Sequence, residues 1–216
     1  YEDRKFEQNI QGALANGIQV GVYFYSGASN AREAYDEASY CISLIRDYQI
    51  TYPVAFDWEL DGDYDSVTEA CETFCNVISS YGYQPMVYSN RNRWYNNFDG
   101  EKIASKYKVW MAAYFGKFYY DSVRWTYGDD LPNFRYHYDM WQYSSRCYVD
   151  GISGQVDVDI AFFGYANYHV DTKDAVLTVT NKEIKRTYGE GIGRLTEELN
   201  LLDGVKGINT IGYDMD

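Results

Sequence analysis

Short apolar runs alternate with longer amphipathic stretches over the first 168 residues, and this alternation constrains the fold more than any other feature. Short runs bounded by turn residues predict strands, and apolar residues three or four apart predict helices. A strand–helix repeat of this kind is typical of a parallel sheet or barrel covered by helices. The sequence therefore predicts an α/β domain over residues 1–168.

Six strands and three longer helices follow from this pattern. The predicted strands are residues 18–26, 53–60, 85–89, 108–114, 138–145 and 155–163. A first helix opens the chain and stops at Asn16-Gly17, and two others cover residues 31–48 and 66–80. A short helical region runs through Ile103, and a long loop follows the fourth strand.

The composition changes after residue 168. Of 25 Tyr, 10 Phe and 5 Trp, only Tyr188 and Tyr213 lie beyond that point. The segment that begins with DAVLTVT alternates β-branched residues and contains turn-prone residues, which indicates strands without helices. We therefore expect residues 169–216 to form a separate β domain.

Charge and cysteine content argue against several classes of partner. The chain has 19 Lys and Arg against 32 Asp and Glu, a net charge of -13 that disfavours nucleic acid. No apolar run approaches the roughly 20 residues that span a bilayer, so no membrane partner is predicted. The four cysteines form no Cys-x-x-Cys pair, so neither zinc nor another cofactor is predicted. Cys71 and Cys75, one helical turn apart, are interpreted as core thiols.

The acidic segment VAFDWELDGDYD carries the sharpest chemical signal. Asp57 and Glu59 are two apart on a predicted strand, so both side chains point to one face and Trp58 to the other. Barrel enzymes place catalytic groups at this end of a strand, and a close carboxylate pair keeps a proton on one member. The alternative, which spacing supports equally, is a solvated pair bound to Lys or Arg.

The same segment matches a calcium loop in part. The acids at its first, third, fifth and twelfth positions are Asp61, Asp63, Asp65 and Glu72. Ser66 stands where such a loop requires Gly, and Ser66 with Glu69 also reads as a capping box that starts the next helix. We therefore predict no metal site.

Aromatic and polar residues gather at the other strand ends. Tyr88 and Gln142 end two predicted strands, and Asp157 and Asp159 lie two apart on the last one. Aromatic residues make up 19% of the chain and suit the apolar faces of sugar rings, although filling a core is the alternative for any single ring. Together these residues predict an aromatic-walled cleft lined by carboxylates.

Five ordered segments resemble glycoside hydrolase family 25, the bacterial and phage muramidases also called Chalaropsis-type lysozymes. These segments are NIQGALANGIQVGVYFYS, PVAFDWEL, PMVYSN, VWMAAY, and WQYSS followed by VDGISGQVDVDIAFF. The resemblance implies an irregular (β/α) TIM-like barrel of eight strands. It also implies hydrolysis of the β-1,4 bond between N-acetylmuramic acid and N-acetylglucosamine in peptidoglycan, without a cofactor, by a secreted or cell-wall-associated protein of bacterial or phage origin.

The resemblance also implies roles for particular residues. Glu59 would be the general acid, Asp57 would stabilise the charged transition state or intermediate, and Asp157 would be a further acidic site residue. The glycan groove would be lined by Tyr23, Tyr88, Trp110, Tyr114, Trp141 and Gln142. Attack by water, by Asp57 or by the substrate's own N-acetyl group remain open alternatives.

The chain departs from the family pattern in three places. Family members begin with a strand that carries a Gly-Ile-Asp-Val-Ser type motif, then a second strand, and neither occurs here. We therefore expect the chain to be an excerpt of a longer protein, poorly soluble and inactive alone, with an open edge at residues 18–26. Asp159 stands where the family usually has Asn, and residues 169–216 resemble the start of a bacterial Ig-like domain.

Two other functions fit the same residues. A chitinase-like glycosidase also carries acids at alternate positions of a barrel strand and uses aromatic walls. A non-catalytic module that binds peptidoglycan would need the same cleft without the chemistry. The combination of WQYSS with GQVDVD favours the muramidase over the chitinase-like enzyme.

Overall fold

The computed structural model describes residues 2–126 and 128–163, together with the backbone of residues 176–179 and 205–208. The chain divides into two units, Tyr1–Tyr165 and Ala166–Asp216. The helices of the first unit are α1 (Phe6–Ala15), α2 (Ala31–Ile45), α3 (Tyr64–Ser80), α4 (Arg91–Asn96), α5 (Gly100–Ala104) and α6 (Gly116–Tyr120). Its strands are β1 (Val22–Tyr25), β2 (Val54–Asp57), β3 (Pro85–Asn90), β4 (Lys108–Ala112), β5 (Met140–Cys147) and β6 (Val156–Ala161).

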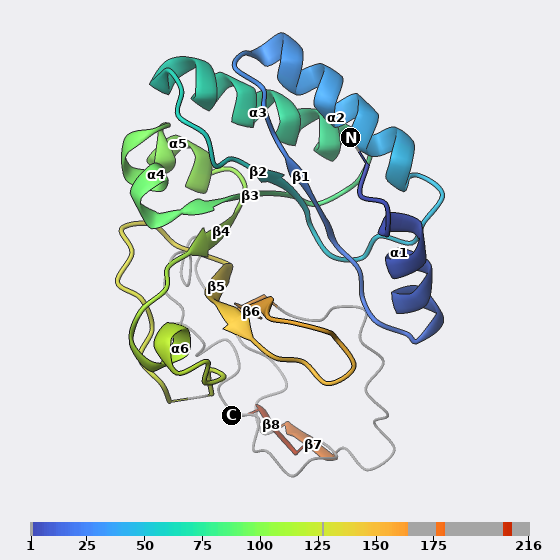
Figure 1. Cartoon of the computed structure of the whole chain (residues 1–216), viewed down its shortest axis with the longest axis vertical. Helices are drawn as coiled ribbons and strands as arrows, with labels where there is room; N and C mark the ends of the chain where they lie inside the picture. The colour runs from blue at the N-terminus through green and yellow to red at the C-terminus, as the bar shows by residue number, and fades with distance from the viewer. Residues whose placement is uncertain (1, 127, 164–175, 180–204, 209–216) are drawn as a thin grey trace. The chain divides into compact units, whose positions relative to one another are not determined.

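The six strands form one curled sheet in chain order, which confirms the predicted α/β class and strand number (Figure 1). Strands β1 to β5 are parallel, and β6 pairs antiparallel with β5. The reversal follows from the connection between β5 and β6, which is short and contains no helix, because a parallel return needs a long crossover. The alternation of apolar runs did not reveal this reversal.

Several element boundaries differ from the prediction, and two of these differences lie close to the acidic segment. Strand β2 ends at Asp57, so Glu59 lies beyond it. Helix α3 starts at Tyr64 because the Asp63 carboxylate accepts a hydrogen bond from the Ser66 amide at 3.1 Å and caps the helix. The capping box expected to start at Ser66 is therefore wrong.

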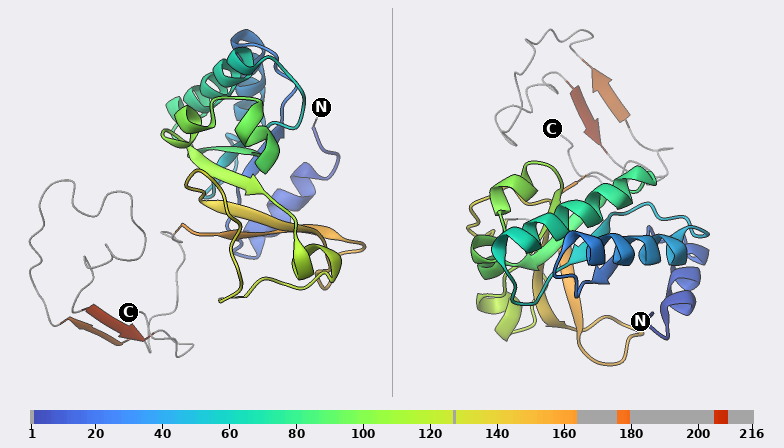
Figure 2. Two further views of the ribbon diagram at one scale, coloured as in Figure 1. Left: turned by 90° about the vertical axis from the view of Figure 1, so that its left-hand side faces the viewer. Right: turned by 90° about the horizontal axis from the view of Figure 1, so that it is seen from above.

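Helices α2 and α3 lie side by side across one face of the sheet, and Figure 2 shows this layer from two other directions. Their buried residues recur three or four apart: Ala34, Ala38, Cys41, Ile42 and Ile45 in α2, and Val67, Ala70, Cys71, Phe74, Cys75 and Ile78 in α3. The Phe74 ring lies 5.1 Å from that of Phe56 on β2. All four cysteines are free and buried, which confirms Cys71 and Cys75 as core thiols.

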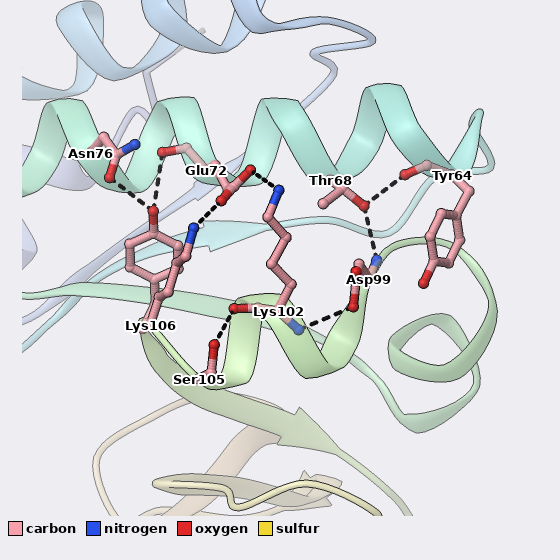
Figure 3. Close-up of polar contacts among 9 residues, drawn as sticks. Tyr64, Thr68, Glu72, Asn76, Asp99, Lys102, Ser105 and Lys106 are labelled. Atoms are coloured by element: carbon pink, nitrogen blue, oxygen red, sulfur yellow. Dashed lines mark hydrogen bonds and ion pairs between the residues drawn. The ribbon is translucent and has the colours of Figure 1, made fainter.

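A set of polar contacts fastens α3 to α5 (Figure 3). The Glu72 carboxylate accepts hydrogen bonds from Lys102 Nζ at 2.7 Å and from Lys106 Nζ. The Thr68 hydroxyl accepts a hydrogen bond from the Asp99 amide at 2.8 Å. The Glu72 carboxylate is thus bound by two lysines. Among the described residues, no three His, Cys, Asp or Glu side chains are placed to hold a metal ion.

Of the second unit the structure describes β7 (Val176–Val179) and β8 (Val205–Ile208), which pair antiparallel with Val176 opposite Ile208. The Ig-like assignment of residues 169–216 and the boundary at residue 168 otherwise lie outside the described residues. In the part of the chain that is described, no helix has the length and apolar character needed to cross a membrane.

Candidate active site

The register of the parallel strands brings one row of side chains to the inner face of the sheet. Tyr25, Asp57, Tyr88 and Trp110 are paired in succession across β1 to β4. Paired residues of neighbouring strands point to the same side, so these four side chains converge although they come from segments far apart in the sequence. The rings of Tyr88 and Trp110 lie 4.6 Å apart.

This row lies in a pocket of about 690 Å³ at the carboxyl ends of the parallel strands. The residues that line it are Tyr23, Tyr25, Asp57, Glu59, Tyr88, Trp110, Tyr114, Gln142, Ser145, Gln155, Val156, Asp157 and Asp159. The structure therefore brings together every site residue expected from the sequence except Trp141.

Trp141 lies on the opposite face of the sheet. It is paired with Met111, and its side chain is fully buried against Phe115, with ring centroids 5.5 Å apart. The Trp141 Nε1 donates a hydrogen bond to the carbonyl of Ala113 at 2.9 Å. Because side chains alternate along a strand, the neighbour that faces the pocket is Gln142, and Trp141 is a core residue rather than a groove residue.

Asp57 and Glu59 form the first of two acidic pairs. Asp57 is the last residue of β2 and is only 6% exposed, and its Oδ1 is buried with no hydrogen-bond partner among the described residues. Burial, reinforced by the negative charge of Glu59, raises the pKa of Asp57 to about 7. Glu59 is half-buried and lines the same pocket from just beyond the strand. Trp58 between them points into the core, as the alternation predicts.

Asp157 and Asp159 on β6 form the second acidic pair. The Asp159 carboxylate accepts a hydrogen bond from Trp110 Nε1 at 2.6 Å. Burial and the charge of Asp157 raise the pKa of Asp159 to about 7 against the opposing effect of that bond. Asp157 is exposed and accepts a hydrogen bond from Gln142 Nε2 at 3.4 Å, and desolvation raises its pKa.

Gln142 connects the aromatic wall to the second acidic pair. It is 4% exposed, and its Oε1 accepts hydrogen bonds from the hydroxyls of Tyr88, at 2.9 Å, and Tyr114. Burial raises the pKa of Tyr114 to about 12 and that of Tyr88 further, so both hydroxyls keep their protons and donate. With Oε1 and Nε2 both engaged, Gln142 fixes the orientation of three pocket residues.

Several lining residues were not assigned to the site from the sequence: Tyr25, Ser145, Gln155 and Val156. Tyr25 stands two residues after Tyr23, so strand alternation was the signal that could have found it. Ser145 lies in β5, Gln155 ends the β5–β6 connection and Val156 begins β6. Predicting that these residues line the pocket would have required knowing that β6 runs antiparallel to β5, and no local sequence pattern indicated this.

A pocket that combines buried acids of raised pKa, Asp57 and Asp159, with aromatic walls can hold a sugar ring and move a proton at a glycosidic oxygen. The fold and the site together define an α/β protein of the glycoside hydrolase class. The model of the glycosyl hydrolases family 25 matches residues 1–152, and the chain belongs to this family. The match confirms the resemblance found in the sequence.

Two relatives illustrate the similarity. The autolytic lysozyme of Clostridium acetobutylicum is 26% identical over 164 residues, which cover 74% of this chain and 44% of that protein. The structure of the CTP1L endolysin is 26% identical and superposes with a TM-score of 0.62 over 74% of this chain and 53% of the endolysin chain.

The autolysin LytC of Streptococcus pneumoniae is similar in both sequence and structure. It is 28% identical, with a TM-score of 0.59, over 74% of this chain and 37% of the LytC chain, and it has also been solved with a synthetic peptidoglycan ligand. The present chain thus spans about half, or less, of the length of each of these three proteins.

Proposed function

We propose that this protein is an N-acetylmuramidase that cleaves the β-1,4 bond between N-acetylmuramic acid and N-acetylglucosamine in peptidoglycan. The observation that carries the proposal is the pocket in which Asp57 and Glu59 face an aromatic wall, with a buried Asp57 oxygen that has no partner among the described residues. Similarity to a lysozyme, an endolysin and an autolysin solved with a peptidoglycan ligand supports this substrate.

Glu59 is the proposed general acid. Its half-buried carboxyl beyond the end of β2 can contact a bound glycan, whereas Asp57 lies almost fully buried beneath it. Below about pH 7 the free protein carries a proton on Asp57. A ligand group that donates to Asp57 Oδ1 favours its ionised form, which then stabilises positive charge on the sugar ring.

The remaining lining residues have supporting roles in this proposal. Asp157 adds negative charge opposite the first acidic pair, and Tyr23, Tyr88, Trp110 and Tyr114 form the walls on which sugar rings lie. Gln142 holds this wall in place rather than serving only as a substrate contact.

We further propose that the curled sheet belongs to an irregular (β/α) barrel and that residues 169–216 form an Ig-like domain of a protein acting at the cell wall. The strand–helix order of residues 1–163 supports the barrel, and the loss of aromatic residues after residue 168 supports a separate domain. Limited proteolysis should cut near residues 169–173 and release a fragment that melts independently. A chain that resists cleavage there contradicts the separate domain.

The test of function is a turbidity and reducing-end assay on purified peptidoglycan with the full-length protein. New reducing ends on N-acetylmuramic acid support the proposal. Cleavage of chitooligosaccharides in preference to peptidoglycan would indicate a chitinase-like enzyme. Sedimentation with peptidoglycan and no new reducing ends would indicate a binding module.

A further inference from the structure

Glu59 lies in a segment without regular secondary structure, between the end of β2 at Asp57 and the start of α3 at Tyr64. A catalytic group has to be held within about 0.5 Å of its productive position, which strands and helices do more readily than loops. Something outside the strand ladder has to fix the backbone of this segment.

Two side chains bind the backbone carbonyls on either side of Glu59. The Ser89 hydroxyl donates to the carbonyl of Trp58 at 2.6 Å, and Arg93 Nε donates to the carbonyl of Leu60 at 3.1 Å. Ser89 is fully buried, so its bond is shielded from water. The bond from Arg93 is charge-assisted, which makes it stronger than a neutral one.

Both donors belong to one short stretch. Ser89 lies near the end of β3, and Arg93 lies in α4, which begins directly after that strand (Figure 1). The Asn90 side chain between them caps α4 by accepting a hydrogen bond from the Arg93 amide at 3.0 Å. The turn from β3 into α4 therefore presents both donors from a defined backbone.

The segment around Glu59 is also packed at both ends. Trp58 is 2% exposed and stacks on Phe56, and its amide donates to the carbonyl of Tyr88 at 3.1 Å. A Cβ atom at Gly62 would lie 2.7 Å from the Val67 side chain, so the chain passes close to α3 there. Leu60 is 37% exposed, and in the part of the chain that is described the bond from Arg93 Nε to its carbonyl holds the middle of the segment.

We propose that Ser89 and Arg93 are positioning residues that hold Glu59 at the pocket by binding the carbonyls before and after it. The catalytic part of this inference rests on the proposed function, whereas the effect on the backbone does not. Arg93 Nη2 also lies 3.9 Å from Asp61 Oδ1, but that carboxylate is 96% exposed, so we assign the positioning to the Leu60 carbonyl and not to the ion pair.

The test compares Arg93→Met with Arg91→Met in the full-length protein. Arg91 occupies the same helix, is exposed, and serves as the matched control. We expect Arg93→Met to lower kcat roughly 10- to 100-fold with little change in KM, because a misplaced acid weakens chemistry more than binding. Arg93→Lys, which can still donate to the carbonyl, should recover part of the loss, and Asp61→Asn should have no effect on kcat.

Hydrogen exchange over residues 57–63 provides a readout independent of catalysis. We expect faster exchange there in Arg93→Met and in Ser89→Ala, with β4 and α2 unchanged, and no change in Arg91→Met. Unchanged exchange and unchanged kcat in Arg93→Met, or equal losses in Arg93→Met and Asp61→Asn, would overturn the inference. If the wild-type protein fails to cleave peptidoglycan while the exchange results hold, the proposed function is wrong and the positioning stands.

Discussion

The two acidic pairs of the pocket have the same spacing in sequence but different surroundings. Asp57 Oδ1 is buried and has no hydrogen-bond partner among the described residues. Asp157 and Asp159 both accept hydrogen bonds, from Gln142 and Trp110. Asp57 can therefore accept a hydrogen bond from a ligand, whereas Asp157 and Asp159 already accept hydrogen bonds from residues of the pocket wall. The two acidic pairs therefore differ in their hydrogen-bond partners and not in their spacing along the sequence.

Strand direction adds a second difference between the pairs. Strand β2 runs toward the pocket, so the first acid, Asp57, is the more buried member. Strand β6 starts at the pocket, so the second acid, Asp159, is the more buried member. Burial is the main cause of the raised pKa of both inner acids, Asp57 and Asp159. Each of these two pKa values is raised to about 7.

The substitution Glu59→Gln gives the sharpest test of the difference between the two acidic pairs. We expect kcat on peptidoglycan to fall roughly 10² to 10⁴ fold, because an amide cannot protonate the leaving oxygen. Binding to peptidoglycan and the melting temperature should stay close to wild type. Glu69→Gln, on the exposed face of α3, is the matched control. Near-normal turnover of the Glu59 variant would remove Glu59 from the chemistry.

Asp57→Asn should have the next largest effect. We expect roughly a 10²-fold loss of kcat, because the variant cannot carry the negative charge that stabilises the transition state. The wild-type pH profile should contain a limb near pH 7 from the raised pKa of Asp57, and the variant should lack it. A limb that persists unchanged in the variant would assign that titration to another group.

Gln142→Glu tests the link between the wall and the second acidic pair. The new carboxylate can still accept from Tyr88 and Tyr114 but cannot donate to Asp157, and its charge raises the pKa of Asp157. We expect about a tenfold loss of kcat through misplaced pocket residues, measured as a full pH profile. Gln84→Glu, at an exposed position, controls for the added charge. Equal profiles for both variants would argue against the linking role.

Asp159→Asn should have the smallest effect on activity, a change of about threefold or less, because an amide oxygen can still accept from Trp110. Its effect on stability should depend on pH. The pKa of Asp159 is raised from 3.8 to about 7 in the folded protein, so the wild type loses stability as pH rises through this interval, and Asn does not.

The variant should therefore match wild type near pH 4 and be more stable above pH 7, by on the order of 2 kcal/mol. Urea unfolding at the two pH values measures this difference. An equal or lower stability at high pH would mean that the buried carboxylate is better solvated than its position indicates.

The sequence was sufficient to predict what local patterns encode. Hydrophobic periodicity located all six strands and the covering helices, and the two-residue spacing placed Asp57 and Glu59 in one pocket. Family resemblance added the substrate class, which no local pattern carries.

The errors arose where two local signals compete or where direction matters. Trp141 was assigned to the groove through the family resemblance, and strand alternation alone does not say which face of the sheet holds the pocket. Asp63 and Ser66 can each cap a helix, and the capping hydrogen bond decided for Asp63. The role of Gln142 depends in part on Tyr88, which is 54 positions away in the sequence, a separation at which sequence pattern gives no register.

The reversed direction of β6 has a consequence for how such pockets diversify. Strand β5 ends at the pocket and β6 begins there, so residues 148–155 join them at its rim without entering the helical layer. Rim loops of strand–helix units also tolerate insertions, but each leads into a helix that packs on the sheet, whereas residues 148–155 join two paired strands directly. Here insertions can reshape one wall of the pocket while the sheet and its packing stay as they are. We therefore expect changes of substrate preference to be introduced most easily by altering residues 148–155.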